Sequence, residues 1–200
     1  TSPYAALTDE SRADIFGAYA SMLTPAGIVQ SDDGLATGQQ HVTQDKALSN
    51  LNNYHYTIYV PTNGSVKDLI DAHKLPTWDD VDQVQNCISL IDDRLDAATT
   101  EADSLSLAED LAFMTAQATA MSDVITNFVT YHIQDNSVYV DGDEHANDVY
   151  ESACLDTLTT RFVKLYVNYE RGGDLTITDN SGNQRTVNTS VTDDAGRECF

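Results

Sequence analysis

The sequence predicts an α+β fold, in which early helices pack against a C-terminal β-sandwich or wedge of short strands. Two observations favour this class. Apolar residues recur at three- and four-residue steps through much of the chain before His132, and short β-branched or aromatic runs separated by Gly- and Asn-rich turns follow it. The chain has 200 residues, of which 41% are hydrophobic, so it can bury a core. We expect residues 1–200 to form one domain of a longer protein.

Helices are expected in four places before the pattern changes. In the first thirty residues, Thr8 can cap a helix whose apolar side includes Ile15, Tyr19 and Met22. A second helix is expected at residues 78–95, with an apolar stripe formed by Val81, Val84, Ile88, Ile91 and Leu95. Two further helices are expected at residues 104–120 and 121–132.

One strand is expected early in the chain and five near its end. Residues 54–60 are rich in aromatic and β-branched side chains, and Pro61 ends this strand because proline fixes φ and lacks an amide donor. Thr62 or Asn63 can then accept hydrogen bonds from the free amides of a following helix. The later strands are expected at residues 137–140, 154–160, 162–169, 174–178 and 185–189.

The charge of the chain excludes two classes of partner. Asp and Glu number 32 against 10 Lys and Arg, which gives a formal net charge of -22. Nucleic-acid binding needs the opposite sign, and anionic lipid headgroups would repel so acidic a surface. We therefore expect no nucleic-acid partner and no direct membrane insertion of the folded domain.

The three cysteines do not form a recognisable site. Cys87, Cys154 and Cys199 are widely and irregularly spaced, which is neither a metal-ligand pattern nor a dense disulfide framework. At most one disulfide can form among them, and the sequence does not say which. We expect Cys87 and Cys154 to be small, buried apolar residues.

Residues that could carry catalysis or bind a metal are few. Asp141, Asp143 and Glu144 offer three carboxylates within four residues, but their order lacks the pattern of a calcium loop, and they are weak metal candidates. Adjacent Asp pairs cannot supply the separated carboxyl groups of a glycosidase. Nucleophile elbows, zinc-protease helices and phosphate-binding glycine loops are missing from the sequence. We therefore expect a protein that is not an enzyme and needs no cofactor or metal.

Three segments together resemble the fasciclin domain family. Residues 56–63, followed by Val66 and Leu69, run from a strand through a Pro-Thr-Asn turn into a helix. Residues 128–133 contain a Tyr-His pair before the later strands, and residues 175–178 and 185–188 form a predicted hairpin. The resemblance spans about residues 13–191, with signature segments at 54–70 and 124–140 and C-terminal strands at 154–189. It is closest in character to surface-exposed fasciclin-like proteins of gut Bacteroidetes. The family's closing strand is missing here, and we expect it elsewhere in the longer protein.

The resemblance implies an extracellular adhesion or interaction module that binds a protein or glycan at the cell surface or in the extracellular matrix. Such a protein is secreted or held at the surface, as an outer-membrane lipoprotein is, through an upstream signal or lipid anchor. Tyr131 and His132 would be its binding pair, although the imidazole could instead satisfy buried backbone groups where helix meets strand. Two alternatives remain: a structural subunit completed by strand addition from a neighbouring domain or chain, and, less favoured, a polysaccharide-acting enzyme.

Overall fold

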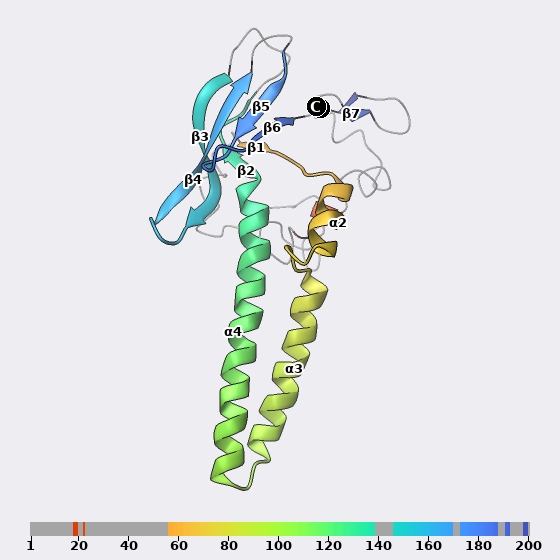
Figure 1. Ribbon diagram of the computed structural model, residues 1–200, viewed down its shortest axis with the longest axis vertical. Coiled ribbons are helices and arrows are strands. Elements are labelled where there is room, and N and C mark those ends of the chain that lie inside the picture. Colours follow the sequence, from red (N-terminus) through yellow and green to blue (C-terminus); the bar gives the residue numbers. More distant parts are fainter. Residues whose placement is uncertain are drawn as a thin grey trace, which may run out of the picture. The chain divides into compact units, whose positions relative to one another are not determined.

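The structure is a computed structural model, and the residues that it describes are 18–19, 22, 56–138, 146–169, 173–187, 191–192 and 198–199 (Figure 1). Within these ranges helices precede most of the strands, which confirms the predicted α+β class. The chain divides into two compact units. One is helical and comprises Lys67–Thr126, and the other contains the β-sheet, together with the residues before Lys67 and from Asn127 onward.

The first fully described helix, α2 (Asn63–Asp71), follows strand β1 (Tyr56–Ile58) through the turn at Pro61. Thr62 caps this helix, because its Oγ accepts a hydrogen bond from the Ser65 amide at 3.2 Å. The expected strand-turn-helix order is therefore confirmed at this point. Val66, on α2, is fully buried.

Helix α3 (Trp78–Asp96) begins with a complete capping box. The Thr77 Oγ accepts from the Asp80 amide at 3.1 Å, while the Asp80 carboxylate accepts from the Thr77 amide at 2.8 Å. The Thr77 hydroxyl also donates to the Asp80 carboxylate, at 2.7 Å. This bond and the bond from the Thr77 amide hold the pKa of Asp80 below its usual value. The side chains of lower exposure on α3 confirm the predicted stripe: Val81, Val84, Ile88, Ile91 and Leu95.

Helix α4 (Glu101–Tyr131) is one continuous helix of 31 residues, so the expectation of two helices divided near Met121 is wrong. Glycine and proline are missing between its ends, and nothing else breaks its backbone hydrogen bonds. Ser122 could have capped a new helix. Its hydroxyl instead donates to the Ala118 carbonyl one turn earlier, at 2.9 Å, which keeps it inside a continuous helix.

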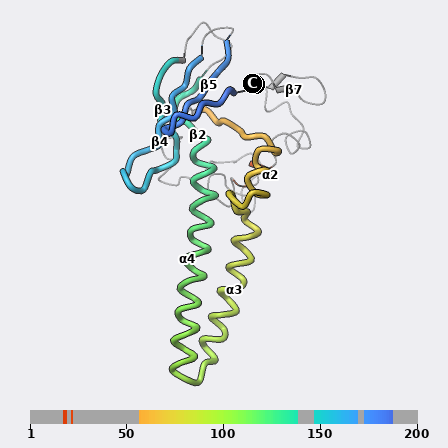
Figure 2. The backbone as a smooth tube through the Cα atoms, in the orientation of Figure 1, coloured from red at the N-terminus to blue at the C-terminus, as the bar shows by residue number. Residues whose placement is uncertain are grey.

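Helices α3 and α4 form an antiparallel hairpin joined by residues 97–100 (Figure 2). On α4, the positions of lower exposure alternate steps of three and four residues, which is the spacing of a helix-helix seam. These positions are Ser104, Leu107, Leu111, Met114, Ala118, Met121 and Ile125. The seam therefore occupies one side of each helix and leaves the other sides to solvent.

The sheet contains six antiparallel strands in the order β1-β2-β3-β4-β5-β6. After β1 come β2 (Ile133–Asp135), β3 (Ala146–Asp156), β4 (Arg161–Tyr169), β5 (Leu175–Thr178) and β6 (Gln184–Val187). A separate pair is formed by β7 (Val191–Thr192) and β8 (Glu198–Cys199). The last three strands of the six lie close to their expected positions, and the Asn-rich turn expected between β5 and β6 is present.

Two strand predictions before β4 are wrong. Residues 137 and 138 are not in a strand, residues 139 and 140 lie outside the described part, and the strand that follows α4 is β2. The strand expected at residues 154–160 starts earlier and ends at Asp156. Asp156 ends it because its carboxylate accepts from the Leu158 amide at 2.9 Å and the Thr159 hydroxyl at 2.8 Å, which closes a turn.

The core of the sheet unit lies on one face of β4. Exposure alternates along this strand, and Leu165, Val167 and Tyr169 are each at most 4% exposed. Val167 and Tyr169 cluster with Leu175 of β5, and Tyr59 packs against this cluster. Burying side chains of this size stabilises a fold by about 1.5–3 kcal/mol each, so this face anchors the sheet.

Candidate functional site

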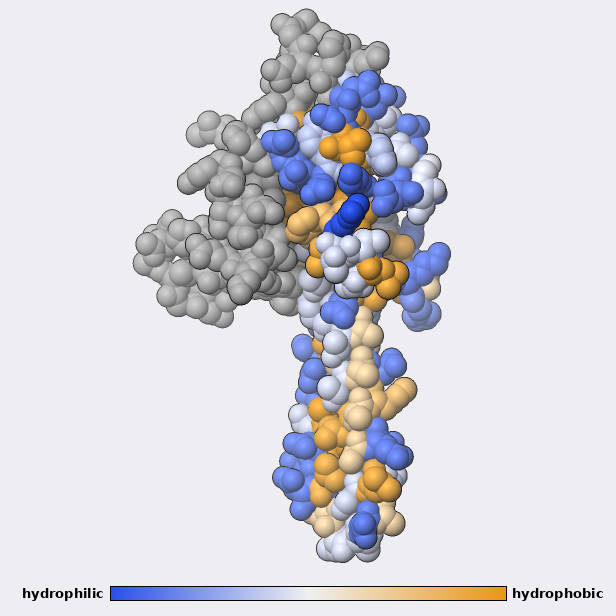
Figure 3. All heavy atoms as spheres, turned by 90° about the vertical axis from the view of Figure 1, so that its left-hand side faces the viewer, coloured by the Kyte–Doolittle hydropathy of each residue, from blue (hydrophilic) through white to orange (hydrophobic). Residues whose placement is uncertain are grey.

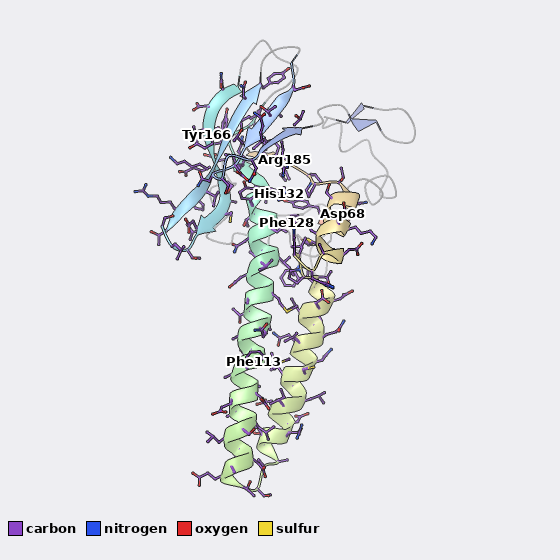
Figure 4. All side chains as sticks on the ribbon, viewed as in Figure 1. Asp68, Phe113, Phe128, His132, Tyr166 and Arg185 are labelled. Carbon is purple, nitrogen blue, oxygen red and sulfur yellow. The ribbon has the colours of Figure 1, made fainter. Side chains whose placement is uncertain are left out.

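The junction between α4 and β2 contains Tyr131 and His132, the two residues that sequence resemblance implies as a binding pair. His132 lies close to Phe128 at the end of α4 (Figure 4). Its ring centroid lies 4.6 Å from that of Phe128, 5.7 Å from that of Tyr19 and 5.8 Å from that of Tyr131. The imidazole is thus one member of a packed aromatic cluster.

The hydrogen bonds of this cluster connect side chains to the end of α4. The His132 Nδ1 lies 2.6 Å from the Phe128 carbonyl oxygen, and because a carbonyl can only accept, this nitrogen carries the proton. The Tyr19 hydroxyl donates to the Val129 carbonyl at 2.9 Å. The first bond satisfies a carbonyl group that the last turn of the helix leaves without an intrahelical partner, whereas the Val129 carbonyl also accepts from the His132 amide at 3.2 Å.

Burial sets the protonation of this junction. Desolvation lowers the pKa of His132, against the smaller effect of its bond to Phe128, so the ring is neutral at pH 7. Burial also raises the pKa of Tyr131, which is only half-buried, and the nearby Asp179 carboxylate adds to this. These contacts account for His132 as a structural residue, which was the alternative that the sequence left open. A binding role for the pair remains a prediction.

Sequence reasoning missed a buried polar group next to this junction. Gln134 on β2 is fully buried, and its Oε1 accepts from the Tyr59 hydroxyl at 2.7 Å. Cys154 is also buried in β3, and its pKa is raised, chiefly by that burial, so it is not poised as a nucleophile. Cys87 is exposed on α3, so the expectation that it is buried is wrong.

The acidic segment with Asp141, Asp143 and Glu144 lies outside the described residues. Among the residues that the structure does describe, no three His, Cys, Asp or Glu side chains are grouped so that they could hold a metal ion. None of the described helices combines the length and apolar character needed to cross a membrane.

The solvent face of the sheet is mainly polar. Tyr166 on β4 is 47% exposed, and in the strand register Val149 lies beside it on β3 and Thr178 on β5. The neighbouring register row carries amides and hydroxyls: Asn147, Asn168, Thr176 and Thr186. Around Tyr166 this face therefore combines an aromatic ring and the exposed Val149 with a neighbouring row of hydrogen-bonding groups.

The solvent face of α4 is different, because it is apolar along much of its length. Six small exposed side chains define what we call the alanine face: Ala108, Ala112, Thr115, Ala116, Thr119 and Ala120. They line a shallow groove along the surface of α4. Larger exposed apolar side chains lie on the same helix, with Leu105 63% and Phe113 62% exposed. In Figure 3, pale orange side chains, which are moderately hydrophobic, run along the hairpin.

This part of α4 carries no charge on any side. Residues 111–122 include no Asp, Glu, Lys or Arg, although charged residues make up 21% of the chain. Glu109 and Asp110 precede this run and Asp123 follows it. The run was visible in the sequence. The sequence did not show that this run is an exposed surface, because only the structure shows that the α3 seam lies on a different side of the helix from the alanine face.

Comparison with known proteins adds no family to this description. No family model, no curated protein and no solved structure matches the chain.

Proposed function

We propose that this chain is an interaction module that acts outside the cell and binds another protein through the alanine face of α4. The observation that carries the proposal is the charge-free, exposed apolar surface between Asp110 and Asp123, next to the exposed ring of Phe113. The proposal includes the fasciclin-like assignment and the surface localisation, both of which rest on sequence resemblance alone.

The physical argument starts from what α4 needs to fold. Its side chains of lower exposure lie along a different side of the helix, so the alanine face contributes little to the hairpin. A solvent face with no such role is normally polar, as on α3, where Asp79, Asp82, Asp92 and Asp93 are exposed. Contiguous exposed apolar surface on a soluble protein marks an interaction site. At about 1.5 Å per residue, the uncharged run presents roughly 18 Å of helix.

Site-specific photocrosslinking tests this proposal in cells that display the native protein. A photoreactive amino acid at Phe113 should give a covalent adduct of defined mass with one protein. Leu158, which is 94% exposed in the turn between β3 and β4, is the matched control position and should not give this adduct. The Ala116→Glu substitution should abolish the adduct at position 113. Equal adducts at positions 113 and 158, or no adduct at Phe113, would reject the proposal.

A second candidate function is favoured by the exposed sheet face. Tyr166 offers a ring for stacking on a sugar, and the surrounding amides and hydroxyls can hydrogen-bond to its hydroxyl groups. A glycan array with wild type and Tyr166→Ala is the test. A bound glycan that is retained by the variant would exclude this face.

A further inference from the structure

We propose that the segment bound by the alanine face is a cationic amphipathic helix of another protein, with basic residues at both ends of its contacting side. This inference rests on the proposed function, because it names the partner of the same surface. It follows from the side-chain sizes on α4, the positions of its carboxylates and the sign of its charge.

The small side chains favour a helix as the occupant. Ala108, Ala112, Ala116 and Ala120 recur at every fourth residue and are all exposed. Residues four apart form a ridge along a helix, and a ridge of alanines leaves a shallow surface that a second helix can approach closely. Thr115 and Thr119 do not demand a polar partner, because their hydroxyls already donate to carbonyl groups one turn earlier on α4.

Carboxylates bound the face at both ends. Glu109 and Asp123 are exposed and fourteen residues apart, which is close to four helical turns, so they lie on nearly the same side of α4 as each other. Asp123 also lines the groove of the alanine face, and Glu109 is the residue next to Ala108. The rise of an α-helix separates the two carboxylates by about 21 Å along the axis. A helix lying along α4 therefore meets a carboxylate, then an uncharged apolar stretch, then a second carboxylate. Lysine or arginine about fourteen residues apart would match this arrangement.

The charge of the chain argues against a second copy as the occupant. Helix α4 contains five acidic residues and no Lys or Arg: Glu101, Asp103, Glu109, Asp110 and Asp123. Another α4 could offer only carboxylates to Glu109 and Asp123, and like charges at an interface are unfavourable. The net charge of -22 also repels a second copy at a distance but attracts a basic partner.

Binding of designed peptides to the intact 200-residue chain tests this inference. The probe is a fluorescent 21-residue helix with a Leu/Ala face and Lys residues fourteen positions apart beside that face, made in both chain directions. One control peptide carries the same Lys residues on the opposite face, and another carries Gln in their place. We expect only the matched cationic peptide to bind, with affinity that weakens as NaCl rises from 50 to 500 mM.

Two pairs of substitutions separate local recognition from general attraction to an acidic protein. Glu109→Gln with Asp123→Asn should weaken binding about 3- to 10-fold, because each exposed ion pair contributes only modestly. Asp92→Asn with Asp93→Asn removes the same charge from exposed positions of α3 and should change affinity less than 2-fold. Circular dichroism checks that the variants remain folded.

The possible outcomes each decide the inference. Equal weakening by both pairs of substitutions, equal binding of the control peptides, or no binding of either matched peptide overturns it. Concentration-dependent dimerisation that Ala116→Glu abolishes would show that a second copy occupies the face, which also overturns it. If crosslinking at Phe113 captures a protein while no cationic helix binds, the proposed function stands and this inference fails.

Discussion

Replacing His132 with phenylalanine tests whether this imidazole supports the α4–β2 junction as a neutral, buried group. Phenylalanine keeps a ring beside Tyr19 and Phe128 but removes the 2.6 Å hydrogen bond from Nδ1 to the Phe128 carbonyl. A net hydrogen bond contributes about 1 kcal/mol to stability. We therefore expect the free energy of unfolding at pH 7.5 to fall by about 1 kcal/mol.

The difference between wild type and this variant should depend on pH. Burial lowers the pKa of His132, so the unfolded chain takes up a proton at a higher pH than the folded chain does. The contribution of neutral His132 is therefore fully present above the ordinary histidine pKa of about 6.5 and is lost as the pH falls below it. This loss is up to about 1.4 kcal/mol per pH unit while the folded ring stays neutral. The His132→Phe variant lacks this pH-dependent loss. The free energies of unfolding of wild type and variant, plotted against pH, should therefore converge between pH 6.5 and 5.5.

Urea unfolding, followed by the near-UV circular dichroism of tyrosine at pH values from 5 to 8, measures both effects. His73→Asn is the matched control, because His73 is exposed and has a φ of 53°, which asparagine tolerates. The control retains His132, so it should keep the loss of stability below pH 6.5 that His132→Phe removes. A constant difference between wild type and His132→Phe across this pH range would refute the assignment of His132 as a buried neutral group.

Three further predictions concern contacts away from this ring. Tyr59→Phe leaves the buried Gln134 oxygen without its donor and should cost about 1–3 kcal/mol, whereas adding Gln134→Leu should recover part of this loss in a double-mutant cycle. Additive effects would contradict the pairing. Iodoacetamide should modify Cys87 in the native protein and spare Cys154 until urea unfolds it, as peptide mass spectrometry can show. Equal labelling would contradict the difference in burial. Thr77→Ala removes the α3 cap and should lower the free energy of unfolding, measured by thermal unfolding, by about 1 kcal/mol. An unchanged free energy of unfolding would show that the cap does not stabilise the protein.

Local patterns were sufficient for the elements that local interactions determine. The stripe on α3 follows from the spacing of nearby apolar residues, and exposed and buried positions alternate along β4 from Lys164 to Tyr169. These parts of the fold were predicted because no distant residue decides them. Strand β1 ends at Ile58, two residues before the expected end, so Pro61 limits how far the strand could extend but does not set its last residue.

Several errors arose where distant residues decide the structure. The first half of β3 is polar and does not alternate, so only its pairing with β4 makes it a strand. Gln134 gave no sequence signal of burial, because its partner Tyr59 lies 75 residues away. The candidate face on α4 was missed because only the structure shows that the α3 seam lies on a different side of this helix. Cys87 lies outside the predicted apolar stripe of α3, and it was expected to be buried only because free cysteines usually are.

The substitution Ala116→Glu separates the role of the alanine face in binding from any role in folding. Ala116 is exposed and lies away from the seam, and glutamate is nearly as good a helix former as alanine. We therefore expect the free energy of unfolding to change by less than about 0.5 kcal/mol, as for other surface substitutions. A loss of more than about 1.5 kcal/mol would mean that this face is covered within the folded chain itself. In that case the uncharged run would serve the stability of the protein, and α4 would have no free surface to offer a partner.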